Sequence, residues 1–329
     1  MTKTVLIKLA LLLALFANPV CGAEITILYT SNLGGVIESC GCSGAGITGL
    51  AKRTTLVKQL QSEQEAIHLE CGDAFFGKNT IVEDELKQKK LKARYTKRCL
   101  HIAGIDAYIP GDRDFAAGSE FLLDELLKDM KIPVLAANMG LTQSKVLVKG
   151  GVKTLVVGLS QGPTKSAKAW TSKELEIQET VPALRQVIDE RKTHADLIVA
   201  VVHGDKRFVE DVAKSKLAHI VIDGSGQGSP KEPEVKSGSI VVAAPRDGRY
   251  IGQLKLEVKN EWQKGKTEFQ NKYIAVSSKL PDEPNISAII DEYKNEVIKL
   301  YSAEKSKWKK PRKPIYWFDN VCGYCHPDQ

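Results

Sequence analysis

The segment from residue 24 to residue 53 constrains the fold most, because it joins a strand, a glycine-rich loop and a helix. The apolar run 25–29 is rich in β-branched residues and predicts a buried strand. Leu50, Leu56, Val57 and Leu60 recur at helical spacing after the loop. In open α/β folds, such a loop lies at the carboxyl end of a sheet, where ligands bind. The sequence therefore predicts an α/β protein with its functional site at this loop.

The rest of the chain alternates between predicted strands and predicted helices, which also favours an α/β fold. Strands are predicted at 66–73, ending in Gly-Asp, and at 133–138, 196–202, 219–222, 239–244, 251–258 and 268–276. A hairpin is predicted from 145–148 and 152–159, around Gly150 and Gly151. Helices are predicted at 83–103, 118–130, 180–193, 207–216 and from Pro284 onward.

The first segment resembles the first block of the 5'-nucleotidase branch of the calcineurin-like metallophosphoesterases. That family has a strand followed by His-Thr-Asn-Asp-Leu-His-Gly, and later Gly-Gly-Leu-Ala-Arg. The matching runs here are Tyr29-Thr30-Ser31-Asn32-Leu33-Gly34-Gly35 and Thr48-Gly49-Leu50-Ala51-Lys52-Arg53. The frame of the block is kept, but Asn32 replaces a metal-binding aspartate and Gly34 replaces a metal-binding histidine.

Four later blocks of the family follow in the same order. Gly72-Asp73 matches the aspartate that bridges two metals, and the strand before His203 matches the strand that ends in a histidine ligand. Gly111-Asp112-Arg113-Asp114-Phe115 stands where the family has Gly-Asn-His-Glu-Phe, and Asp223-Gly224-Ser225-Gly226-Gln227 where it has Gly-Gly-His-Ser-His. The run 246–252 resembles the family's closing hairpin.

The resemblance covers about 25–300 and implies a four-layer metallophosphoesterase sandwich, in which two facing mixed β-sheets are flanked by helices, followed by an extended C-terminal tail.

The resemblance implies a weakened site for divalent metal. Hydrolysis with two metal ions requires carboxylate, imidazole and amide ligands from several loops. The ligands that the chain offers are Asp73, His203, Asp112 and Asn32. The histidines expected at Gly34, Ser225 and Gln227 are absent, and Arg113 replaces the histidine that assists the leaving group, so no catalytic residue is assigned. The alternative is that Asp73 and His203 are ordinary hydrogen-bonded loop residues.

Three cysteines form a second candidate site. Cys40 and Cys42 lie in the glycine-rich loop, and Cys71 lies two residues before Asp73. Thiols at this place would suit a thiophilic metal or a redox role. A disulfide is the alternative, since oxidising compartments favour one. The spacing does not separate these interpretations.

The N-terminal residues 1–23 are typical of a secretory signal peptide. Lys3 and Lys8 precede the apolar run 9–16, and Gly22 and Ala23 suit cleavage before Glu24. A retained amphipathic anchor is the alternative. The run is too short to span a bilayer, and no transmembrane segment is predicted in the mature chain. A periplasmic or otherwise extracytoplasmic location is expected.

The net charge of +7 does not indicate nucleic-acid binding. Its positive charges are concentrated in the leader and in the segment 305–313, so the globular body is near neutral. The segment 302–314 is rich in lysine and contains Pro311 and Pro314, which predicts a solvated basic linker.

The C-terminal segment 315–329 carries the most specific short motif, Cys322-Gly323-Tyr324-Cys325-His326. Cys-x-x-Cys-His is the attachment signature of a c-type haem, in which the two cysteines form thioethers and His326 binds the iron. The segment also resembles the start of a multihaem cytochrome module. A redox disulfide and half of a zinc site are the alternatives for the cysteine pair.

These features together predict an exported protein with three parts after the leader: a degenerate 5'-nucleotidase-like domain at 24–301, the linker and the haem segment. Its role is expected in electron transfer or redox-linked binding, with a redox partner protein or a further cytochrome module. A metal-dependent phosphohydrolase that acts on nucleotides or related phosphoesters is the first alternative. A non-catalytic module that binds a small phosphoester is the second.

Overall fold

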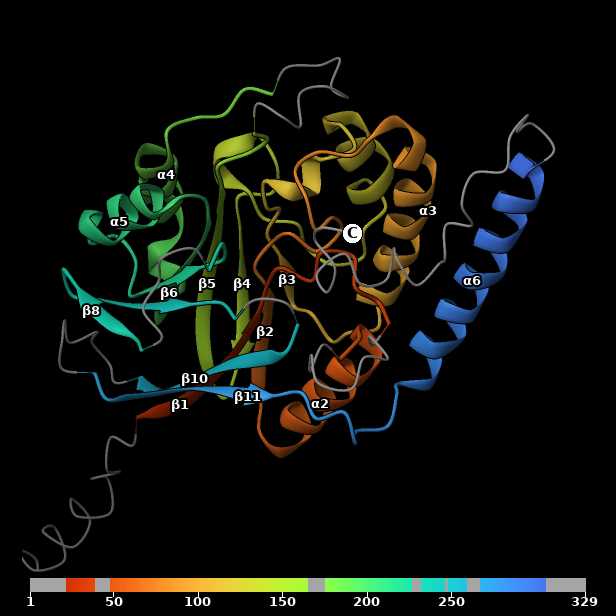
Figure 1. Cartoon of the computed structure of the whole chain (residues 1–329). Coiled ribbons are helices and arrows are strands. Elements are labelled where there is room, and N and C mark those ends of the chain that lie inside the picture. The colour runs from red at the N-terminus through yellow and green to blue at the C-terminus, as the bar shows by residue number, and fades with distance from the viewer. Residues whose placement is uncertain are drawn as a thin grey trace, which may run out of the picture.

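The computed structural model describes residues 22–38, 48–164, 175–226, 232–245, 248–258 and 267–305. In this part of the chain two mixed β-sheets face each other and helices cover their outer faces (Figure 1). Buried side chains fill each of the interfaces between layers, one between the sheets and one under the helices on either side. The predicted four-layer sandwich is confirmed.

The first sheet has the strand order β11-β10-β1-β2-β3. Its central strand β1 (Ala23–Thr30) pairs in parallel with β2 (Ala66–Glu70) and antiparallel with β10 (Tyr250–Val258). β3 (Ala107–Tyr108) and β11 (Phe269–Ala275) form its edges. Because β1, β2 and β3 run in parallel, the loops that follow them meet at one edge of the sheet.

The second sheet has the order β4-β5-β6-β7-β9-β8. Its parallel centre consists of β5 (Val152–Ser160), β6 (Leu197–His203), β7 (Ile220–Asp223) and β9 (Ser239–Ala243). β4 (Ser144–Lys149) and β8 (Glu234–Lys236) flank it in antiparallel pairing. All residues of β6 are buried, as expected for a central parallel strand.

The helices form two groups (Figure 1). α4 (Thr180–Arg191) and α5 (Lys206–Ser215) pack on the outer face of the second sheet. α2 (Leu50–Glu63) packs on the first sheet, while α3 (Glu83–Leu100) and α6 (Pro284–Lys305) pack against each other beside it. Short helices complete the part of the chain that the structure describes: η1 (Arg113–Phe115), η2 (Phe121–Leu127, a π-helix), η3 (Ala137–Met139) and η5 (Lys192–His194).

Two predicted elements differ from the structure. The segment 133–138 forms only isolated bridges at Val134 and Leu135, because the chain then turns into η3. The strands predicted around 246–252 do not form a hairpin with each other, since β9 and β10 belong to different sheets. β10 is already paired on both sides, with β1 and β11.

Two helix boundaries also differ. The helix predicted at 118–130 is shorter and is a π-helix over its central part, although it still buries Phe121, Leu122 and Leu126. The linker predicted from residue 302 begins later, because α6 continues to Lys305. Lysines near a helix C-terminus interact favourably with the helix dipole, so a basic composition does not end the helix.

A buried ion pair ties α2 to the first sheet. Arg53 Nη2 lies 2.8 Å from Glu70 Oε2, and both side chains are fully buried. Thr30 Oγ1 donates to the same carboxylate oxygen at 2.9 Å. The pair therefore links the helix, β2 and β1.

We predict that Arg53→Met lowers the free energy of unfolding by about 3–5 kcal/mol, because it leaves the Glu70 carboxylate buried without its partner. Chemical denaturation measures the change. Lys236→Met is the control, since Lys236 pairs with Glu234 at 2.7 Å on the surface and should cost at most about 1 kcal/mol. Equal losses in the two variants would contradict this role of the Arg53–Glu70 pair.

Candidate metal centre

The candidate site lies where the carboxyl ends of the two sheets meet. Asp73 follows β2 and Asp112 follows β3, while His203 is the last residue of β6 in the other sheet. One potential ligand atom from each of these residues lies within 4.8 Å of the others. The sequence prediction that places these three side chains in one site therefore agrees with the geometry.

Backbone shape brings the loops this close. Asn32 and Asp73 have φ angles of 55° and 56°, a left-handed conformation that Asn and Asp tolerate better than most residues. Gly72 has a φ of +111°, and a Cβ there would lie 2.2 Å from His203 Nδ1. A Cβ at Gly111 would lie 2.2 Å from Asp73 Oδ1. Glycine at these two positions is what allows the three loops to approach one another.

The Asp73 carboxylate is fully buried and its two oxygens have different surroundings. Oδ1 accepts a hydrogen bond from the backbone N–H of Arg113 at 2.8 Å. Oδ2 lies 2.8 Å from Arg113 Nε and 3.3 Å from His203 Nε2, but no N–H is aligned on it. A buried carboxylate oxygen without an aligned donor suits a metal ligand, since a cation needs no N–H geometry.

His203 is oriented by the backbone. Its Nδ1 donates to the carbonyl of Cys71 at 2.7 Å, which turns Nε2 toward the carboxylates of Asp73 and Asp112, each at 3.3 Å. Burial alone lowers the pKa of His203, but the Asp73 and Asp112 carboxylates raise it well above its ordinary value. Nε2 therefore carries a proton when no metal is bound, and a metal ion has to displace that proton.

Arg113 places a second cation in the site. Its Nε lies beside Asp73, its Nη2 donates to Asn32 Oδ1 at 2.8 Å, and its Nη1 donates to the carbonyl of Gly77 at 3.2 Å. Asn32 is held from the other side as well, because its Nδ2 donates to the carbonyl of Gly224 at 3.1 Å. The predicted ligand Asn32 thus lies beside the site, with its side-chain oxygen directed at the Arg113 guanidinium rather than at the triad.

The donor set fits one divalent cation. Asp73, Asp112 and His203 supply two carboxylates and an imidazole, which many divalent metals accept. A second ion between Asp73 and Asn32 would have to share that space with the guanidinium of Arg113. Ser225, where the resemblance predicts a histidine, donates its hydroxyl to Asp223 Oδ1 at 2.8 Å instead. Gln227 lies outside the described residues.

Asp114 is a site residue that the sequence analysis did not single out. Its buried carboxylate accepts backbone N–H groups of Asp73 and Phe75, each at 2.9 Å, and of Gly111 at 2.8 Å. It also accepts the hydroxyl of Tyr108. Burial and the nearby Asp73 charge raise the pKa of Asp114 to about 7. An aspartate two residues after a candidate ligand, in a glycine-containing turn, was the available signal.

The predicted thiol site is only partly within the described residues. Cys71 has a free, buried thiol, and burial raises its pKa well above the ordinary value. Such a thiol is a poor nucleophile and does not suit a redox role. The backbone carbonyl of Cys71, not its sulfur, supports the site through His203. Cys40 and Cys42 lie outside the described residues, as do the leader residues 1–21 and the haem motif Cys322, Cys325 and His326.

Comparisons with known proteins show similarity to 5'-nucleotidases in sequence. No family model matches the chain. The chain is similar to the 5'-nucleotidase of Mus musculus, with 28% identity over 313 residues, covering 82% of this chain and 52% of the relative. The human 5'-nucleotidase is 27% identical over 335 residues, covering 86% and 55%. The chain thus spans about half the length of the curated relatives it matches.

Solved structures share the fold. A 5'-nucleotidase precursor from Thermus thermophilus superposes with a TM-score of 0.68 at 17% identity, covering 84% of this chain and 60% of that one. A calcineurin-like phosphoesterase from Bacillus subtilis superposes with a TM-score of 0.64 at 18% identity, covering 85% and 99%. In the described part of this chain, no helix is long and apolar enough to cross a membrane.

We predict that the metal-free protein binds about one Mn²⁺ per chain, with an apparent affinity that rises about tenfold per pH unit while His203 is protonated. The proton on Nε2 competes with the metal, and the pKa of His203 is raised, so the rise should continue above pH 7. Isothermal titration calorimetry at several pH values measures both stoichiometry and affinity.

Two variants test this assignment. His203→Gln should lose most of the binding and its pH dependence, whereas His194→Gln, at an exposed position, should change neither. Binding of two ions by the unaltered protein, or an affinity independent of pH, would contradict the one-cation site.

Proposed function

We propose that this is an exported protein in which a 5'-nucleotidase-like phosphoesterase domain is joined to a C-terminal c-type haem, with a role in electron transfer or redox-linked binding. In this proposal the domain binds an anionic ligand and is not an efficient hydrolase. One observation carries this part of the proposal: the Arg113 guanidinium lies against Asp73 and Asn32.

Arg113 limits the hydrolytic chemistry that the site supports. Hydrolysis with two metals depends on a pair of cations about 3.5–4 Å apart that activate water and clamp the phosphate. A guanidinium carries a positive charge, but it binds no hydroxide as a metal does. It also stays protonated in proteins, so it cannot serve as a general acid for the leaving group. Arg113 therefore neutralises Asp73 without replacing the function of a metal ion.

The same charges favour an anionic ligand. Asp73 and Asp112 contribute two negative charges and Arg113 contributes one positive charge. A divalent cation on Asp73, Asp112 and His203 would supply Lewis-acid character there and would balance the charges of the two carboxylates, which leaves the Arg113 charge available to an anion. The carboxylates of Asp73 and Asp112 would orient that cation, while Asn32 and Arg113 close the opposite side. A small phosphoester fits this charge balance.

A metal-dependent phosphohydrolase remains the second candidate. The clustering of Asp73, Asp112 and His203 within 4.8 Å and the similarity to 5'-nucleotidases favour it. Under this candidate, hydrolysis would depend on a single metal ion and Arg113. Both candidates include ligand binding, so the rate of turnover is what distinguishes them.

The haem part of the proposal rests on the sequence. Cys322, Cys325 and His326 have the spacing of a c-type attachment motif, and the predicted leader would deliver the chain to a compartment where haem is attached. A redox partner protein or a further cytochrome module would then exchange electrons with this haem.

We predict that the purified protein hydrolyses nucleotide monophosphates and activated aryl phosphates only slowly, even when Mn²⁺ or another divalent metal is supplied. The reason is that the Arg113 guanidinium lies where a second metal ion would bind and cannot donate a proton to the leaving group. Phosphate release measures the rate. Rapid, metal-dependent turnover that is lost in Asp73→Ala, but kept in the control Asp189→Ala at an exposed position, would favour the phosphohydrolase instead.

We also predict covalent haem in protein matured in an exporting host that ligates haem. The Soret absorption should survive acid–acetone extraction, because two thioethers hold the porphyrin. Cys325→Ala should lose most of the attached haem, and His326→Ala should change the spectrum of any haem that remains. Tyr324→Phe is the control, since this position forms no thioether. Extractable haem, or none, in the unaltered protein would refute the haem assignment.

A further inference from the structure

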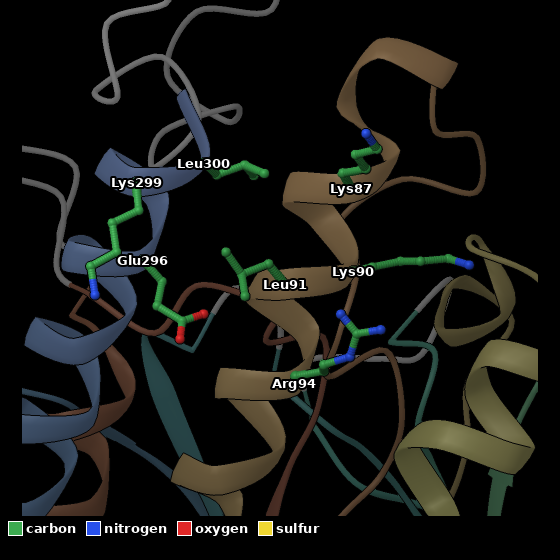
Figure 2. A pocket seen from close by; sticks show the side chains of 7 residues that line it. All are labelled: Lys87, Lys90, Leu91, Arg94, Glu296, Lys299 and Leu300. Carbon is green, nitrogen blue, oxygen red and sulfur yellow. The ribbon is translucent and has the colours of Figure 1, made fainter. Parts of the chain in front are cut away.

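A groove of about 520 Å³ lies between α3 and α6, on the side of the molecule away from β6 (Figures 1 and 2). We call it the α3–α6 groove. It is lined by Lys87, Lys90, Leu91, Arg94, Glu296, Lys299 and Leu300. No residue of the candidate metal centre lines it, so it requires a separate explanation.

The floor of the groove is apolar, and its rim has more basic than acidic side chains, with Glu296 as the one acidic residue of the lining. Leu91 from α3 and Leu300 from α6 point into the gap between the helices, and both are only half-buried (Figure 2). Lys87 and Lys299 are exposed at the rim. Lys90 and Arg94 turn away from α6, over the ring of Phe121, at 4.7 Å and 5.4 Å from its centroid. The groove therefore offers an apolar surface to a ligand, with positive charge around it.

The chain that follows α6 starts beside this groove. α6 ends at Lys305, five residues after Leu300, which corresponds to about 7.5 Å along a helix. The segment 306–314 that comes next can span up to about 30 Å when extended. Residues 315–319 are thus close enough to return to the groove.

Residues 315–319 also have the matching chemistry. Ile315, Tyr316, Trp317 and Phe318 form an apolar run, and a run of this kind is costly to expose to water. A lysine ammonium group interacts favourably with the face of an aromatic ring, so Lys87 and Lys299 are suitable partners for the aromatic residues of this run. Asp319 directly follows the run and has the charge opposite to that of the rim. The basic residues of 306–314 would be repelled by the rim and remain outside the groove.

We propose that the apolar run 315–318 of the same chain docks in the α3–α6 groove, with Asp319 at the basic rim. The side chains of the run cover Leu91 and Leu300, and the basic linker crosses the solvent between the end of α6 and the groove. Docking would hold the C-terminal segment against the phosphoesterase domain. This proposal does not depend on haem, because the docking residues precede the Cys-x-x-Cys-His motif.

Photocrosslinking in the full chain tests the proposal. Trp317 is replaced by p-benzoylphenylalanine, and crosslinked peptides are identified by mass spectrometry. Crosslinks should concentrate on the parts of α3 and α6 that line the groove. Leu91→Asp should reduce their yield about tenfold, which corresponds to about 1.4 kcal/mol. Val148→Asp is the control, since Val148 is an exposed apolar residue of β4, 59% accessible and outside the groove, and it should leave the yield unchanged.

A second variant separates the loss of docking from the loss of folding. Lys299→Glu reverses a rim charge at an exposed position without altering the core, and should lower the crosslink yield through repulsion of Asp319. Crosslinks spread over the whole surface, or a yield unaffected by both groove variants, would overturn the proposal. Crosslinks between two chains that increase with protein concentration would also overturn it and identify a second copy as the occupant.

Discussion

The buried carboxylate of Asp73 must be compensated where the two sheets meet, since an isolated charge there would be very costly. Arg113 and His203 supply the positive charge, one from the loop after β3 and one from the end of β6. Asp114 fixes the backbone on which Asp73 sits by accepting the N–H groups of Asp73, Phe75 and Gly111. The packing of both sheets at this edge therefore depends on a network of charges, in which each member has a partner from another loop.

This network is compatible with two states of the site. Without metal, a protonated His203 lies between Asp73 and Asp112, and its pKa is raised by them. The same three side chains would hold a divalent metal, which would compete with the proton on His203. Arg113 stays beside Asp73 in both descriptions, so the Asp73 carboxylate keeps one cationic partner independent of metal supply. A guanidinium does not provide the hydrolytic power that a second metal ion would provide.

The sequence predicts the positions of the site residues better than their roles. The resemblance locates His203 and Asp73 on two buried apolar segments: His203 is the last residue of β6, and Asp73 follows β2 in the Gly-Asp pair. The role of Arg113 is not predictable from the same pattern. Spacing places its Cα beside the metal ligands, but only the structure shows that the side chain turns inward to Asp73 and Asn32.

The same limit applies to Cys71, whose carbonyl rather than its thiol supports the site. The strand partners were also ambiguous, since the alternation of strands does not tell which sheet β9 and β10 join.

The buried charge network makes Asp73 and His203 important for stability as well as for metal binding. Removal of one member of a buried charge network leaves its partners unpaired, which costs more than the loss of a surface pair. Arg113 compensates Asp73 and donates to Asn32, so a single guanidinium holds the loops after β1, β2 and β3 together. A fold with the loops of a phosphoesterase and a guanidinium among them can therefore remain stable, because Arg113 compensates the charge that those loops bury.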